Sequence, residues 1–470
     1  MRRVFSYALL YVNHALANDA EIVSLIGKGD VRETASAEWK VAAVQQKLLG
    51  GWFVRTREMS QMSLLLRDNT QVRLNQSSIL NIKRVGEPTT QLELSRGRAW
   101  SQAKQKGPDS ATVRGQPIVE LTTPSATARV RGTDWELTVD DAGTAILVVL
   151  TGEVDFYNEF GKVVVLPNEQ ARAEIGKAPF KSLLSSAADR VQWVTAYRPQ
   201  PRRWVTDYSD GFEAVAKDIE SAEYQRALDV LAKLRIAPKT GLRASLLLAD
   251  MHLFQGQAAD AIRLLEPIAT GGKGDAMAAA LQSRAYMIAG RLAEARQLLA
   301  LSVATNTGHA EVLLALTELE RLQGNADAAK ATARRVLEID AKNAEAWYQI
   351  GRIETEREYA TAAREALQQA LALRADGPGY RGELATLETF ANQFTRAEAS
   401  FRQALEQQPD DYVALTGLGV LQLKRGDPAG ALESFLKAGV IEPRYARAAL
   451  FSGMAHYQLR EHIRAVELLD

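Results

Sequence analysis

The chain has 470 residues, which is too long for one compact core and predicts two or more domains, or an array of repeats. Lysine plus arginine and aspartate plus glutamate both number 57, so no net charge draws the chain to nucleic acid or to an acidic membrane. The absence of cysteine excludes disulfides, thiolate catalysis, cysteine-bound zinc and the lipid-bearing cysteine of a bacterial lipoprotein.

Residues 1–17 have the pattern of a secretory signal peptide. Two arginines precede a short apolar stretch from Val4 to Val12, and Ala15 and Ala17 form a small-x-small cleavage site. We therefore expect cleavage after Ala17 and a periplasmic or other extracytoplasmic location. Because the apolar stretch is short and contains Ser6, the alternative is an ordinary amphipathic start or a misassigned initiator methionine. No later run of about 18 apolar residues predicts a transmembrane helix.

Residues 18–180 are predicted to form an all-β domain. Short alternating runs are interrupted by turn residues: Leu64 and Leu66 precede an Asp-Asn turn, and Val72 and Leu74 follow it at period two. Strands at this spacing, with no helical segment between them, favour an antiparallel sandwich, barrel or β-roll.

The stretch TARVRGTDWEL, residues 127–137, contains a change in this alternation. Apolar and small side chains occupy even positions before the change and odd positions after it (Ala126, Ala128 and Val130, then Trp135, Leu137 and Val139). One residue must be absorbed between the two runs, and a β-bulge at a glycine would do so. We interpret the motif as structural, with charged neighbours such as Glu136 facing solvent (motif residues Arg131, Gly132, Thr133 and Trp135). A binding or catalytic role is the alternative, although no histidine occurs in the β region.

These strands resemble the FecR domain, the β-rich extracytoplasmic module named after the ferric-citrate regulator. The shared elements are a Val-Arg-Gly-Thr-x-aromatic strand, a Gly-x-Val strand after it, and an upstream VRT strand before the hairpin RDNTQVRL. The resemblance covers about residues 20–175. In the best-known members this domain passes a signal from an outer-membrane transporter to a cytoplasmic sigma factor, through a membrane helix and an N-terminal helical segment. This sequence shows neither segment, so the resemblance implies the extracytoplasmic module alone.

Residues 208–470 are predicted to form an all-α solenoid of about eight repeats, the last one incomplete. An alanine recurs every 34 residues without insertion (Ala227, Ala261, Ala295, Ala329, Ala363, Ala397, Ala431 and Ala465). A fixed 34-residue period indicates stacked helix pairs. Small residues and turn glycines recur in the same frame, and segments such as AEAWYQIGRIETEREYATAAREALQQALAL resemble tetratricopeptide repeats closely.

The resemblance to tetratricopeptide repeats implies a concave groove lined by the first helix of each pair. By the frame of that family, the inward positions include aliphatic, aromatic and arginine side chains, which suit a protein or peptide ligand (Leu246, Phe254, Arg284, Met287, Leu314, Arg321, Tyr348, Arg352, Phe390, Leu423, Met454 and Tyr457). The alternative is that several of them pack between repeats. The pattern lacks the Lys/Asn set by which some members clamp a terminal carboxylate.

A linker, residues 181–207, separates the two predicted domains. Pro199 and Pro201 make it extended, and arginines alternate with Tyr197 and Trp204. The linker is either a basic and aromatic contact patch, or a segment whose aromatics cover the open end of the first repeat while its arginines stay solvated.

No catalytic, cofactor-binding or metal-binding residues are predicted, and the chain is not expected to be an enzyme. The five histidines form no i,i+4 pair, and the loop GGKGD at 271–275 lacks the spacing of a phosphate-binding loop. The favoured function is an exported adaptor with protein partners in the cell envelope. An extracytoplasmic sensor related to FecR-type regulators of iron uptake is the alternative.

The last residues lack a polar capping helix after Leu468 and Leu469. A solenoid end without a cap exposes its apolar flank. We therefore expect the chain to continue into further repeats or another domain, or this end to be covered by a second copy or a partner.

Overall fold

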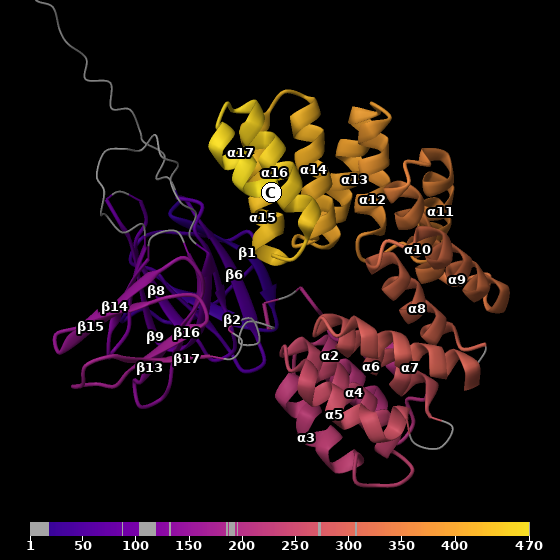
Figure 1. The fold of residues 1–470 in the computed structure, drawn as a ribbon, viewed down its shortest axis with the longest axis horizontal. Coiled ribbons are helices and arrows are strands. Elements are labelled where there is room, and N and C mark those ends of the chain that lie inside the picture. The colour runs from indigo at the N-terminus through magenta and orange to yellow at the C-terminus, as the bar shows by residue number, and fades with distance from the viewer. Residues whose placement is uncertain are drawn as a thin grey trace, which may run out of the picture.

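The computed structural model describes residues 18–86, 88–102, 119–130, 133–184, 187, 193–194, 196–270, 274–305 and 308–469. A β region comes first and an arc of helices follows it (Figure 1), so the predicted fold class is confirmed. The predicted signal peptide lies outside the described residues, as do Arg131 and Gly132 of the motif.

The described β region contains seventeen strands in one hydrogen-bonded network. They are β1 (Ala20–Ile26), β2 (Gly29–Arg32), β3 (Lys40–Val41), β4 (Lys47–Leu48), β5 (Phe53–Thr56), β6 (Gln61–Leu66), β7 (Gln71–Leu74), β8 (Ile79–Arg84), β9 (Thr90–Gln102), β10 (Val119–Thr122), β11 (Thr127–Val130), β12 (Asp134–Val139), β13 (Ala145–Thr151), β14 (Val154–Asn158), β15 (Gly161–Val165), β16 (Glu169–Ala173) and β17 (Phe180–Leu183). Nearly all pairs are antiparallel, as the alternating pattern predicts; β10 runs parallel to β9.

The long strand β9 divides this network into two sheets. Its first half pairs with β8 and β10, and its second half pairs with β7 and β12. Gly97 lies between the halves with φ +95°, and a Cβ there would be 2.4 Å from the Cα of Ser78. Only glycine fits this backbone and this spacing, so Gly97 lets one strand contribute to both sheets.

The change of alternation marks a second passage between the two sheets. β11 pairs with β10 and β14, whereas β12 pairs with β13 and the second half of β9. The residues expected to be apolar-facing are buried on both sides of the change, including Val130 and Trp135, and Thr133 is buried too. The change of phase therefore carries the chain from one sheet to the other. The proposed bulge glycine, Gly132, is not among the described residues.

Glu136 was expected to face solvent, and that prediction is wrong. Its side chain is 1% exposed, because Trp193 of the linker covers this face of β12. The Trp193 indole Nε1 donates a hydrogen bond to Glu136 Oε2 at 2.8 Å. The alternation of a strand predicts which side chains share a face, but a later segment decides whether that face is solvated.

The helical region consists of antiparallel helix pairs that follow a short first helix. The helices are α1 (Pro201–Trp204), α2 (Phe212–Glu220), α3 (Tyr224–Leu234), α4 (Gly241–Phe254), α5 (Ala258–Ala269), α6 (Ala276–Ile288), α7 (Leu292–Thr305), α8 (Ala310–Leu322), α9 (Ala326–Ile339), α10 (Ala344–Glu356), α11 (Ala360–Leu373), α12 (Tyr380–Phe390), α13 (Phe394–Gln407), α14 (Tyr412–Lys424), α15 (Pro428–Ile441), α16 (Ala446–Gln458) and α17 (His462–Leu469). None of the described helices is long and apolar enough to span a membrane.

The repeated alanines lie at the centre of this packing. Each of the eight is at most 2% exposed, on the second helix of its pair. Small residues on the first helices are equally enclosed: a Cβ added to Gly351 would lie 2.6 Å from Leu367, and one added to Gly419 would lie 2.4 Å from Phe435. The 34-residue period therefore comes from helices that approach closely at the same point in every repeat.

Candidate functional site

The linker crosses the inner side of the helical arc. Residues 196–204, here called the crossing segment, consist of an extended stretch followed by α1. Their partners lie on α4, on α8, before α14 and at the end of α15. These partners come from both ends of the arc and, through α8, from its middle, and Figure 1 shows the arc curving back toward the β region. Pro199 lies in the extended part of the segment, whereas Pro201 is the first residue of α1, so the expectation that both prolines keep the linker extended is wrong for Pro201.

Asp250 on α4 receives three hydrogen bonds from the crossing segment. The Tyr197 hydroxyl donates to Oδ1 at 2.5 Å, the Trp204 indole Nε1 donates to the same oxygen at 3.0 Å, and the Gln200 backbone N–H donates to Oδ2 at 2.6 Å. Asp250 is fully buried. Burial raises the pKa of this carboxyl to about 6, although the three hydrogen bonds act to lower it.

Two arginines of the crossing segment pair with carboxylates that lie far apart in the sequence. Arg203 Nε donates to Glu311 Oε2 at 2.8 Å, and both side chains are less than one fifth exposed. Arg198 pairs with Asp410, which also accepts a hydrogen bond from the Ser24 hydroxyl of β1 at 2.7 Å.

The backbone of the crossing segment is bound as well. The Ala196 N–H donates to Glu442 Oε2 at 2.8 Å, just after α15. With the Gln200 N–H on Asp250, two carboxylates of the repeats accept bonds from peptide groups. Such bonds can form with any extended chain except at proline, so part of this recognition does not depend on the side chains that are bound.

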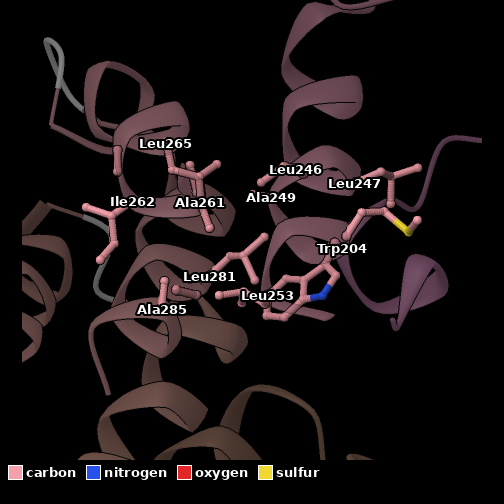
Figure 2. Close-up of a cluster of buried hydrophobic side chains, with 14 of the residues drawn as sticks. Trp204, Leu246, Leu247, Ala249, Leu253, Ala261, Ile262, Leu265, Leu281 and Ala285 are labelled. Atoms are coloured by element: carbon pink, nitrogen blue, oxygen red, sulfur yellow. The ribbon is translucent and has the colours of Figure 1, made fainter. Parts of the chain in front are cut away.

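Trp204 anchors the end of the crossing segment in the core of the first repeats. Its side chain is 2% exposed and lies among aliphatic side chains of α4 and its neighbours, including Leu253 (Figure 2). The Arg284 guanidinium lies 5.8 Å from the ring centroid. A buried aromatic next to paired charges is the usual make-up of a strong contact in a protein interface.

Comparison with protein families gives the two regions their names. Residues 53–155 match the FecR protein family, and residues 286–353, 344–376 and 383–439 match tetratricopeptide repeat families. The chain carries a FecR domain followed by tetratricopeptide repeats. Both resemblances predicted from the sequence are thereby confirmed. No curated protein matches the chain.

Solved structures resemble one part of the chain or the other. A proposed anti-sigma factor from Parabacteroides distasonis is 17% identical, covers 31% of this chain and 68% of its own, and has a TM-score of 0.26. A tetratricopeptide repeat protein from Parabacteroides merdae is 16% identical over 55% of this chain and 98% of its own, with a TM-score of 0.40. A repeat protein from Thermus thermophilus is 23% identical over 38% of this chain and 97% of its own, with a TM-score of 0.34.

The predicted groove residues differ in how far they are exposed. Several are buried among the helices, at most 8% exposed (Leu246, Phe254, Leu314, Tyr348 and Leu423). Others are exposed (Phe390, Met454 and Tyr457). Met287 is partly buried against the core of the first repeats.

The three predicted groove arginines all make charge or ring contacts within the repeats. Arg284 pairs with Glu318 at 3.2 Å, and Arg321 pairs with Glu356 at 3.0 Å. The Arg352 guanidinium lies 5.7 Å from the Tyr348 ring centroid. Of the predicted groove residues, Arg284 is in ring contact with Trp204 of the crossing segment, and Leu246 and Phe254 share a core cluster with Trp204.

The carboxylates that hold the crossing segment were not among the predicted site residues (Asp250, Glu311, Asp410 and Glu442). A signal was present for Asp250, since an acidic residue interrupts the apolar helix LLLADMHLF, where a buried charge needs a partner. The expectation that the linker arginines stay solvated is wrong for Arg203. It describes Arg202 better, which is about half exposed and pairs with Glu213 and Glu220 of α2.

The FecR domain contacts the repeats at two places. Val23 and Leu65 pack against Leu436 and Val440 of α15, and Lys437 pairs with Glu21 at 3.0 Å. At the other end of the arc, the Gln61 amide donates to the Phe254 carbonyl of α4 at 3.3 Å. A cavity of about 390 Å³ lies beside this second contact, bordered by strands of the FecR domain, by Trp193 and by the turn after α4.

Within the described ranges, no group of three or more histidine, aspartate or glutamate side chains could hold a metal ion. Around the crossing segment, carboxylates of the repeats accept hydrogen bonds from side chains and backbone of the same chain.

Proposed function

We propose that this protein is an exported, non-enzymatic scaffold that binds extended segments of protein partners along the inner face of its repeats. In this proposal the FecR domain docks to a component of the cell envelope, and the location is periplasmic. The observation that carries it is the crossing segment, since the repeats already bind an extended peptide through its backbone N–H groups as well as its side chains. Tetratricopeptide repeats bind partners by complementary packing of this kind.

The second candidate is a sensor that relays a signal between the FecR domain and the repeats. Asp410 favours it, because this one carboxylate accepts hydrogen bonds from Ser24 of the FecR domain and from Arg198 of the crossing segment. A ligand that shifts β1 would therefore also disturb how the crossing segment is held.

Site-specific photo-crosslinking in the native host tests partner binding. The crosslinker p-benzoylphenylalanine replaces Phe390, an exposed aromatic at the end of a first helix, or Gln369, an exposed residue on a second helix, as the control. We expect the Phe390 variant, and not the Gln369 variant, to crosslink to envelope proteins. Equal or absent crosslinking at the two positions would contradict the proposal.

Fractionation tests the location. The mature protein is expected in the periplasmic fraction, with Asn18 as its first residue. An intact Met1 on protein recovered from the cytosol would rule out export.

A further inference from the structure

Two partners of the crossing segment are buried carboxylates, which need hydrogen-bond donors. Asp250 is fully buried, and Asp410 is 4% exposed. Removing the segment would take three donors from Asp250 and the Arg198 guanidinium from Asp410, which costs considerably more for a buried charge than for a solvated one. The folded repeats are therefore lower in free energy with a segment bound at the inner face than with the inner face empty.

We propose that residues 196–204 are an intramolecular ligand of the repeats, which occupies the inner face until an extended, arginine-containing segment of a partner protein exchanges for it. The inference rests on the proposed function for the existence of such a partner, and it adds how the site is regulated and which chemistry it selects.

The chemistry of the partner follows from the groups that it must replace. Glu311 and Asp410 each require a cation, and the fork of an arginine side chain suits a carboxylate best. Asp250 requires hydroxyl, indole or backbone donors, and the apolar surroundings of Trp204 require an aromatic ring. An acidic segment would bring further negative charge to carboxylates that are already buried, so it is excluded.

Because the crossing segment is part of the same chain, it is a tethered competitor of any external ligand. A segment attached to the domain that it binds is present at an effective concentration in the millimolar range. Any partner segment competes with it, and the apparent Kd of that partner equals the intrinsic Kd divided by the fraction of molecules in which the inner face is free. Weakening the hold on the crossing segment must therefore strengthen the binding of an external peptide.

The linker offers a matched control for this test. Arg198 and Arg203 pair with carboxylates that line the inner face, whereas Arg202 pairs with Glu213 and Glu220 on the neighbouring helix α2. Changing Arg202 removes the same charge from the same segment without releasing the inner face.

The experiment measures the binding of a dye-labelled peptide, AYRPQPRRWV, to the full chain by fluorescence anisotropy. We expect the double variant Arg198→Ala/Arg203→Ala to bind this peptide at least about tenfold more tightly than the unaltered protein. The variant Arg202→Ala should bind it as the unaltered protein does. A peptide with alanine at both corresponding arginines should bind the double variant weakly. Equal affinity of all three proteins, or no binding to a double variant whose circular dichroism is unchanged, would overturn the proposal.

Hydrogen exchange on the unaltered protein provides a measurement that needs no variant. Saturating peptide should increase the exchange of the Ala196 and Gln200 amides, because the external segment displaces the internal one. Bound peptide with unchanged protection at both amides would show that the peptide binds elsewhere. Peptide exchange without any crosslinked envelope protein would refute the proposed function and leave the intramolecular ligand in place, so the two failures can be told apart.

Discussion

Asp250 shows how one residue links the stability of the repeats to the linker. It is an acid on an otherwise apolar face of α4, and it remains buried because three donors of the crossing segment meet its two oxygens. A protonated carboxyl would present a hydrogen to one of those donors, so the bonding pattern suits the ionised form. Burial opposes ionisation, and the balance raises the pKa of Asp250 to about 6.

This raised pKa predicts that Asp250 contributes more to the stability of the folded protein at pH 5 than at pH 7. The folded state binds a proton at Asp250 near pH 6, whereas the unfolded chain does so near pH 4. Stability therefore rises as the pH drops through the folded pKa, by about 1 kcal/mol for this carboxyl. Asp134 and Asp411, whose pKa values burial also raises to about 6, act in the same direction.

Urea unfolding at pH 7 and pH 5 measures the effect, and Asp250→Asn is the matched variant. We expect the variant to be less stable at pH 7, because its amide N–H₂ group faces a donor, and to gain about 1 kcal/mol less than the unaltered protein between the two pH values. An equal gain in both proteins would show that Asp250 does not titrate in this range.

For single residues, the sequence predicted which side chains are buried better than it predicted their hydrogen-bond partners. The alternation of residues 126–139 correctly placed Val130 and Trp135 inside. The same alternation placed Glu136 outside, and Trp193 covers it. The partner of Glu136 is 57 residues away, on a linker with no periodic pattern, and alternation carries no information about such a contact.

The turn between the two helices of each repeat has the same backbone geometry throughout the array. The residue two positions before each second helix adopts a positive φ, at the same 34-residue spacing as the alanines. Glycine occupies it in four repeats and a residue with a side chain in the others (Gly256, Gly290, Gly324 and Gly426; Ala222, Glu358, Asn392 and Arg460). The left-handed backbone conformation is therefore present in all eight turns, including the four without glycine. In those four turns a residue with a Cβ has an unfavourable conformation, which costs energy.

Glu358→Gly should accordingly stabilise the protein. Glu358 is exposed, with φ +63°, so glycine removes a strained conformation without removing a packed side chain. We expect a gain of about 0.5–1 kcal/mol in the free energy of unfolding. Glu365→Gly, an exposed change inside α11, should cost about 1 kcal/mol and serves as the control. A loss of stability in the Glu358 variant would contradict the assignment of strain.

Gly256→Ala and Gly290→Ala separate the turn from the contact with the linker. Both glycines have nearly the same φ, +72° and +74°. A Cβ at Gly290 meets nothing within 4 Å, whereas one at Gly256 would lie 2.2 Å from the Cα of Trp193. Both variants should lose about 1–2 kcal/mol through backbone strain, and Gly256→Ala should lose a further 1–3 kcal/mol, roughly the cost of overpacking. Equal urea midpoints would mean that Trp193 does not lie against this turn.

The elements themselves were the most predictable part of the molecule. The fixed 34-residue spacing required the same close helix contact in each repeat, and every alanine of the series is buried there. Helix packing of this kind is local, because each repeat contacts its neighbours in the sequence. The periodic pattern therefore held all the information needed for the repeats and none about what lies inside the arc.

At the scale of the whole molecule, Arg73 and Gln61 of the FecR domain are among the side chains that connect it to both ends of the arc. Arg73 of β7 donates from its two terminal nitrogens to the Ile441 carbonyl at the end of α15 and to Gln61 Oε1, both at 3.0 Å. The Gln61 amide donates in turn to the Phe254 carbonyl at the end of α4. Carbonyls at helix ends lack partners within their own helix, so the two strands satisfy both ends from outside.

The contact between Arg73 and Ile441 could not be predicted from the sequence. Arg73 and Ile441 are 368 residues apart, and arginine in an alternating strand is typical of a solvated face. Arg73 is instead 1% exposed, and burial lowers its pKa to about 10. A pattern that repeats within each domain predicts the domains, whereas their contact uses residues that belong to no repeating pattern, such as Arg73.

Arg73→Met should therefore loosen the arc where it meets the FecR domain. The change keeps an apolar stem of similar length and removes the donor to Ile441, which leaves a buried carbonyl without that bond at a cost of about 1–3 kcal/mol. We expect amide exchange in α15 to speed up while exchange in α9, in the middle of the arc, stays the same, because repeats contact only their neighbours. The radius of gyration from X-ray scattering should increase as α15 separates from β1 and β6. Unchanged exchange in α15, or equal acceleration in α15 and α9, would show that the closure of the arc does not depend on Arg73.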